Sequence, residues 1–121
     1  MNKVYLTILM VIIIVGLLFY IIIGSINKKN QTILYYCNTC PHCAAVRDWM
    51  DKQHIDKKIT IIQKEVYLNP VNKLEMEQAA RKCKISDREI GVPFFYSDGK
   101  CYIGTPDVIA QIANKAGVPT K

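Results

Sequence analysis

Residues 4–23 form an uninterrupted apolar run that contains no charged side chain. As a helix rising about 1.5 Å per residue, a run of this length would cover the roughly 30 Å hydrocarbon core of a bilayer. A cleaved signal peptide is the alternative, but its apolar region is usually about 7 to 15 residues long, and the residues after this run make a poor cleavage site. We therefore expect a single-pass transmembrane anchor over residues 1–24, a polar linker over 25–31 and one folded domain over 32–121.

The charges beside the apolar run do not fix its orientation. Lys3 and the terminal amine lie on one side, and Lys28 and Lys29 lie on the other, so the positive-inside count is nearly balanced. The formal net charge of +6 would suit nucleic acid, but the lysines are scattered and no aromatic-basic motif accompanies them. We expect no nucleic-acid partner, and the side of the membrane has to follow from the chemistry of the domain.

Beyond residue 31, β-branched and aromatic runs alternate with segments of helical spacing. Asn69-Pro70 and Thr105-Pro106 each combine a capping residue with a first-turn proline, and residues 97–99 are a hairpin turn signal. The pattern predicts an α/β domain with the order βαβαββα. The expected strands cover residues 32–36, 59–67, 92–96 and 100–103, and the expected helices cover residues 40–53, 69–83 and 105–117.

Three of the five cysteines lie within residues 37–43, which indicates a reactive or metal-binding cluster more than a spread disulfide framework. The motif Cys40-Pro41-His42-Cys43 falls where a strand is followed by a helix. Cys40 would lie beside the unpaired N–H groups and positive dipole end of that helix, which favours its thiolate, whereas Cys43 would be sheltered one turn further in. We expect Cys40 to be the nucleophile and Cys43 the resolving thiol.

His42 is expected to tune the oxidising strength of this pair. The helix dipole contributes about 1 kcal/mol, less than one pKa unit, and an imidazolium or N–H donor from His42 would add a further shift. A lower pKa of Cys40 stabilises the reduced form, so the Cys40–Cys43 disulfide becomes a stronger oxidant of substrate thiols. The sequence therefore favours net oxidation over reduction.

Two motifs together suggest a family. The CPHC sequence at residues 40–43 after a strand, followed by Gly-Val-Pro at residues 91–93 before a hairpin, resembles the thioredoxin superfamily across residues 32–117. The chain length and residues 102–107 look most like the glutaredoxin branch, and the Pro-His dipeptide is similar to that of DsbA-type bacterial thiol oxidases. The resemblance implies a thioredoxin-like or glutaredoxin-like fold, and we expect no cofactor.

The resemblance also implies roles outside the CPHC motif. It implies that the Val92–Pro93 bond is cis, that Pro93 faces the active site and that the backbone of Val92 pairs with an extended substrate. Cys37 stands where glutaredoxins usually carry a lysine, and Gly104-Thr105 stand where a Gly-Gly pair often contacts glutathione. We therefore expect protein thiols, rather than glutathione, to be the substrates.

The cysteine cluster allows an alternative from another class, because its three thiols and His42 would supply four soft or borderline metal ligands. Against a zinc or copper module, the adjacent His42 and Cys43 are poorly placed to bind one ion together, and no second cysteine or histidine pair follows. We expect no metal. Cys37 is then either a regulatory thiol able to exchange with Cys40 or a small packed residue.

Cys83 and Cys101 stand apart from the cluster. They could form a structural disulfide in an oxidising compartment, but two buried free thiols are the favoured interpretation.

Together these features predict a membrane-anchored thiol–disulfide oxidoreductase that exchanges its Cys40–Cys43 disulfide with protein thiols and is served by an unidentified redox partner. We expect its domain on the extracytoplasmic side, because the reducing cytosol would oppose net oxidation. The alternative enzyme is a cytoplasmic-facing disulfide reductase or glutaredoxin.

Overall fold

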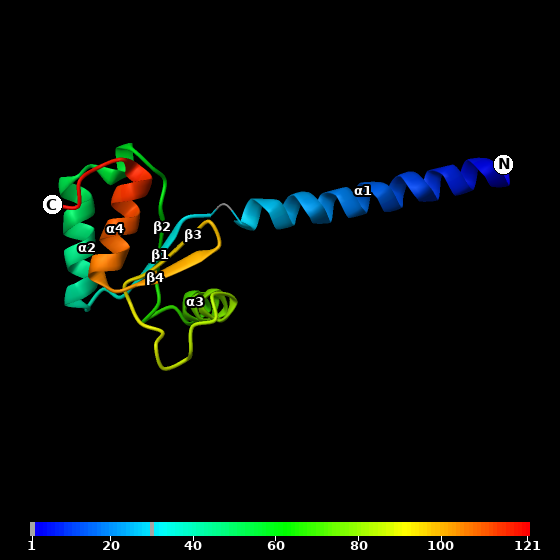
Figure 1. Cartoon of the computed structure of the whole chain (residues 1–121). Helices are drawn as coiled ribbons and strands as arrows, with labels where there is room; N and C mark the ends of the chain where they lie inside the picture. The colour runs from blue at the N-terminus through cyan, green and yellow to red at the C-terminus, as the bar shows by residue number, and fades with distance from the viewer. Residues whose placement is uncertain (1, 30) are drawn as a thin grey trace. The chain divides into compact units, whose positions relative to one another are not determined.

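The computed structural model describes residues 2–29 and 31–121, in two compact units that divide between residues 30 and 31 (Figure 1). The first unit is one helix, α1 (Lys3–Lys29), whose stretch Lys3–Gly24 has a mean hydropathy of 3.2 with none of it buried. Its 27 residues extend over about 40 Å. Helix α1 is therefore long and apolar enough to cross a membrane, and it continues through residues 25–29, where a linker was expected.

The second unit contains four strands, β1 (Ile33–Tyr36), β2 (Ile62–Glu65), β3 (Phe94–Ser97) and β4 (Lys100–Ile103). They form one sheet in the order β2-β1-β3-β4, with β2 parallel to β1 and the β3–β4 hairpin antiparallel beside it. The first three residues of β1 are at most 3% exposed. This central strand is β-branched and aromatic because both of its faces are covered.

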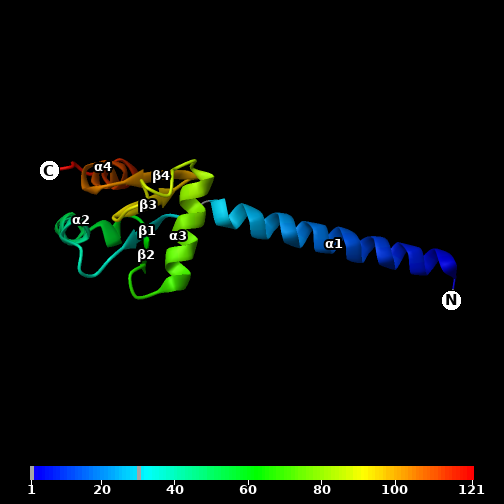
Figure 2. The ribbon, with the colours of Figure 1, turned by 90° about the horizontal axis from the view of Figure 1, so that it is seen from below.

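Three α-helices cover the sheet: α2 (Pro41–Lys52), α3 (Pro70–Lys82) and α4 (Thr105–Ala116). Figure 1 and Figure 2 show α2 and α4 on one face and α3 on the other. Alternate strand residues supply two cores, with Leu34 and Phe95 on the side of α2 and α4, and Tyr35 and Phe94 on the side of α3. The order after α1 is βαβαββα, so the expected α/β class and order of elements are confirmed.

The second strand is shorter than predicted, since residues 59–61 do not join the sheet. The chain first makes a 3₁₀ turn, η1 (Ile55–Lys57), and the Ile59 N–H donates to the Ile55 carbonyl oxygen at 3.0 Å. Ile59 and Ile61 pack on the core between the sheet and α2 and α4. The prediction of one strand over residues 59–67 is wrong at both ends, because burial in a loop can produce the same apolar run as a strand.

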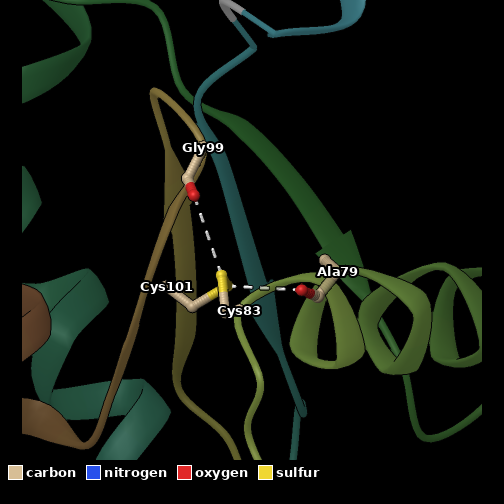
Figure 3. The surroundings of a disulfide bond; sticks show 4 residues. All are labelled: Ala79, Cys83, Gly99 and Cys101. Atoms are coloured by element: carbon tan, nitrogen blue, oxygen red, sulfur yellow. Dashed lines mark hydrogen bonds between the residues drawn. A yellow bond between two sulfur atoms is a disulfide. The ribbon is translucent and has the colours of Figure 1, made fainter.

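Cys83 and Cys101 form a disulfide that joins the C-terminal end of α3 to β4 (Figure 3). The Cys101 sulfur lies 3.5 Å from the Ala79 carbonyl oxygen, and the Cys83 sulfur lies 3.9 Å from that of Gly99. Because a disulfide sulfur carries no hydrogen, these are packing contacts in the oxidised pair. The favoured prediction of two free thiols is wrong, because the packing of α3 on the sheet brings together cysteines that are 18 residues apart in the sequence.

Candidate active site

The cysteine cluster lies at one edge of the sheet. Strands β1 and β2 run parallel and both end at this edge, whereas β3 is antiparallel and begins there, with its first residue Phe94 paired to Tyr35 of β1. Cys37 follows directly after β1, and Pro93 directly precedes β3. The topology therefore brings the cysteine motif and the Gly-Val-Pro motif to the same edge.

Two hydrogen bonds link the start of α2 to Pro93 through the start of α4. The Gly104 N–H donates to the Pro93 carbonyl oxygen at 3.0 Å, and Thr105 Oγ1 donates to the His42 carbonyl oxygen at 3.3 Å. Thr105 was expected to cap α4, but the N-cap is Gly104, at a φ of 90° that favours glycine. The Thr105 side chain contacts His42 instead, a partner 63 residues away that no local sequence signal indicates.

Cys40 is the N-cap of α2 and is partly exposed, with extended backbone angles of φ −87° and ψ 122°. The pKa of its thiol is lowered, chiefly because the backbone N–H of Cys43 donates a hydrogen bond to the sulfur. The Cys43 thiol and the His42 backbone N–H act in the same direction, and partial burial opposes them. Since the N–H donors belong to the first turn of a helix and have no helical partner, the start of α2 stabilises the Cys40 thiolate.

Cys43 lies one turn further into α2 and is 1% exposed. Burial raises the pKa of its thiol to about 11, although the Cys37 N–H, which donates to Cys43 Sγ at 3.4 Å, acts against this. Negative charge on Cys40 or Cys37 raises the pKa further. The two thiols of one motif therefore differ, because one is accessible and readily ionised while the other is buried and protonated near neutral pH.

Pro41 and His42, between these two thiols, are both exposed. Pro41 is the first residue of α2, where a missing N–H costs no helical hydrogen bond. His42 acts on Cys40 through its backbone N–H. The imidazole, which was expected to stabilise the thiolate, is not among the groups that lower the Cys40 pKa in the described part of the chain.

The Val92–Pro93 bond is cis, as the resemblance to thioredoxins implies. Pro93 is fully buried, and Val92 is partly exposed. Val92 thus leaves part of its surface accessible at the sheet edge that carries Cys37.

Arg47 is a further residue beside the cluster that the sequence did not single out. Its guanidinium carbon lies 4.9 Å from the centre of the ring of Tyr36, the last residue of β1. Such a cation–π contact contributes about 0.5–1 kcal/mol at an exposed site. The two residues lie on different elements, so no local pattern pairs them, but their contact fixes α2 against the strand end that precedes Cys37.

Within residues 2–29 and 31–121, no group of three or more His, Cys, Asp or Glu side chains is placed to hold a metal ion. Cys37, Cys40 and Cys43 are free thiols. The arrangement of the cluster therefore offers thiol chemistry, with one accessible and one buried sulfur at a helix start.

Comparison with protein-family models and with curated protein sequences gave no match. Among solved structures, the chain is similar to oxidised glutaredoxin 2 from Chlamydomonas reinhardtii, with 21% identity, 80% of this chain and 94% of that chain covered, and a TM-score of 0.49. It is also similar to Methanosarcina acetivorans methanoredoxin (13% identity, 74% and 86% covered, TM-score 0.47) and to glutaredoxin from Methanosarcina mazei Go1 (13%, 69% and 79%, 0.44). None of these structures shares enough sequence with this chain to transfer the role of a residue.

Proposed function

We propose that this chain is a membrane-anchored thiol–disulfide oxidoreductase that acts on protein thiols through Cys40 and Cys43. The observation that carries the proposal is the unequal environment of the two sulfurs: the Cys40 pKa is lowered by helix N–H donors, whereas Cys43 is 1% exposed with a pKa of about 11. Disulfide exchange uses such a pair, because an accessible thiolate reacts with substrates and a sheltered thiol reacts only within the molecule. This supports Cys40 as the nucleophile and Cys43 as the resolving thiol.

In the oxidising direction, a substrate thiolate attacks Cys40 Sγ of the Cys40–Cys43 disulfide. The bond between the two protein sulfurs breaks, and Cys43 leaves with the electron pair and takes up a proton, which its pKa of about 11 favours. A second substrate thiolate then attacks the substrate sulfur of the mixed disulfide, and Cys40 leaves as a thiolate. The substrate has lost two electrons and gained a disulfide, and both protein cysteines are reduced.

Net oxidation is the proposed direction because of the environment of Cys40. A thiol of lower pKa is the better leaving group, and stabilising its thiolate stabilises the reduced protein. Both effects favour transfer of the disulfide to the substrate. A separate redox partner must then reoxidise the pair.

Val92 and Pro93 are the proposed substrate-binding residues, with the Val92 backbone pairing to an extended segment of the substrate. Their position directly before β3, at the sheet edge that carries Cys37, supports this role. The hydrogen bonds of Gly104 to Pro93 and of Thr105 to His42 also support it, since they connect Pro93 to the start of α2.

We place the domain on an extracytoplasmic side, with α1 as an anchor rather than a cleaved signal. The Cys83–Cys101 disulfide supports an oxidising compartment, because structural disulfides are rare in the cytosol. The 22 apolar-rich residues of Lys3–Gly24 exceed the roughly 7 to 15 residues of a signal peptide core.

The test uses the full chain in detergent. The oxidised protein is mixed with a reduced peptide containing two cysteines, and both are followed by thiol alkylation and mass spectrometry, beside an assay for bound metal. We expect one peptide disulfide for each Cys40–Cys43 pair reduced, and none with the Cys40→Ser variant. A protein that oxidises no peptide and carries stoichiometric metal would support the metal-binding alternative.

The compartment is tested separately in intact cells that produce a Cys37→Ser variant. After mild reduction, a membrane-impermeant thiol reagent should label Cys40 before lysis. Labelling that requires lysis would place the domain on the cytoplasmic side and favour the reductase alternative.

A further inference from the structure

The proposed exchange reaction uses Cys40 and Cys43 and leaves the third thiol of the cluster without a role. Cys37 is a free thiol and is partly exposed, whereas Cys43 is buried. Its position between the end of β1 and the start of α2 puts it on the same segment as the nucleophile.

The segment from Cys37 to Cys40 is a tight turn. The Cys40 N–H donates to the Cys37 carbonyl oxygen at 3.4 Å, and residues 38–39 form the turn between them. The end residues of such a turn have Cα atoms less than about 7 Å apart, and disulfides span Cα separations of about 4.4–6.8 Å. The turn therefore holds Cys37 within the range of a disulfide to Cys40.

Cys37 also contacts the buried thiol. Its backbone N–H donates to Cys43 Sγ at 3.4 Å, and its own sulfur lies 3.2 Å from Thr39 Oγ1. A rotation about χ1 changes the direction of the Cys37 sulfur without moving this backbone contact. The three cysteines thus form one cluster, with Cys37 three residues before Cys40 in the sequence and Cys43 three residues after it.

A second resolving thiol would have an effect because Cys43 alone is seldom ionised. Cys43 is 1% exposed, and this burial raises the pKa of its thiol, so only a small fraction of Cys43 is a thiolate near neutral pH. Only the thiolate attacks a disulfide, so resolution by Cys43 leaves time for a competing thiol.

We propose that Cys37 is a second resolving cysteine, held by the turn at residues 37–40, which releases substrates from mixed disulfides at Cys40. The Cys37 thiolate attacks Cys40 Sγ, the Cys37–Cys40 bond forms, the bond to the substrate breaks, and the substrate sulfur leaves with the electron pair and takes up a proton. Cys43 can then attack Cys40, which restores the Cys40–Cys43 disulfide and returns Cys37 to a thiol. The steps need no other oxidant or reductant, and they rest on the proposed role of Cys40 as the nucleophile.

The experiment uses the full chain in detergent, with the three cluster thiols reduced and Cys83–Cys101 intact. The probe is dithiobis(nitrobenzoate), an aromatic disulfide, added at less than one molecule per protein. Attack by Cys40 releases one coloured thiolate and leaves the other on the protein, and resolution releases the second. We expect the Cys43→Ser variant to release twofold more thiolate per molecule of probe than Cys37→Ser/Cys43→Ser, with a Cys37–Cys40 disulfide in its peptide map.

Equal release by the two variants would overturn the proposal, and so would a disulfide-linked dimer as the oxidised product of Cys43→Ser on a non-reducing gel. A Cys37→Ala/Cys43→Ser variant repeats the comparison if the serine variant does not fold. The two proposals fail differently. A stable probe adduct on Cys40 of Cys43→Ser refutes the role of Cys37 alone, whereas a Cys40→Ser variant that reacts as fast as the parent refutes Cys40 as the nucleophile.

Discussion

Cys40 and Cys83 lie at opposite ends of two helices in the same domain. Cys40 is the N-cap of α2 and a free thiol, whereas Cys83 is the C-cap of α3 and is bonded to Cys101. A helix start presents unpaired N–H groups and positive potential to a sulfur, and a helix end presents carbonyl groups and negative potential. A thiolate is therefore stabilised at the first position and not at the second.

Cysteine thus serves two purposes in one fold, as a structural crosslink and as a reactive thiol. A disulfide whose sulfurs are poor leaving groups resists exchange, whereas one that can release a stabilised thiolate exchanges readily. The type of helix end thus distinguishes the Cys83–Cys101 pair, which joins α3 to β4, from the Cys40–Cys43 pair, which is proposed to react.

The largest expected effect is on activity. Cys40→Ser should lower the rate of dithiol-peptide oxidation at least about a thousandfold, because it removes the nucleophile. Cys83→Ala/Cys101→Ala should stay within about twofold of the parent at a temperature well below its melting point. Initial rates with the full chain measure both, and a similar loss in both variants would contradict the separation of the two pairs.

Stability should show the opposite pattern. Removing both Cys83 and Cys101 should lower the free energy of unfolding by about 3 kcal/mol, because the crosslink closes a loop between residues 18 apart. Cys37→Ala is the matched control, a partly exposed cysteine without a crosslink, and it should cost less than about 1 kcal/mol. Urea unfolding measures these changes, and equal losses would show that the disulfide adds no more than packing.

The pH dependence of alkylation should separate the two thiols of the reactive pair. Because thiolates form above the pKa, the midpoint of the Cys40 rate should lie below the ordinary thiol pKa of about 8.5. The midpoint of the Cys43 rate should lie above it, because burial raises the pKa of Cys43. Iodoacetamide rates against pH, read by mass spectrometry in Cys43→Ser and Cys40→Ser, give the two midpoints. A common midpoint would remove the basis for unequal roles.

A smaller effect is expected where α4 contacts the start of α2. Thr105→Val should lower the free energy of unfolding by about 1 kcal/mol, because the hydroxyl that donates to the His42 carbonyl oxygen is lost. Thr105→Ser keeps the hydroxyl and should recover most of this stability. If the valine and serine variants unfold alike, the hydrogen bond does not hold the two helices together.

The smallest effect is expected for His42→Ala. Its imidazole is exposed, and the backbone N–H that acts on Cys40 remains in the variant. A charge acting through water contributes up to about 1 kcal/mol, so the potential should become more negative by less than about 20 mV. Equilibration with glutathione redox buffers measures the reduction potential of the Cys40–Cys43 pair. A shift of about 30–60 mV would show that the imidazole contributes to the reactivity that distinguishes this pair from Cys83–Cys101.

The sequence predicted the parts of this molecule that local patterns specify. The apolar run before residue 24 has the length and composition of a membrane-crossing helix. Asn69 is the N-cap predicted before a first-turn proline, and its side chain accepts from the N–H groups of Val71 and Asn72. The position of Cys40 at a strand-to-helix junction was readable for the same reason. Caps and periodicity act over a few residues, so a linear sequence displays them.

The tertiary structure decided what depends on residues far apart in the chain. The bond between Cys83 and Cys101 and the contact of Thr105 with His42 arise only when α3 and α4 pack on the sheet. Their partners are 18 and 63 residues away in the two pairings, where no local propensity acts. Burial also raises the pKa of Cys43, and the size of this effect depends on how many elements surround the sulfur rather than on its neighbours in the sequence.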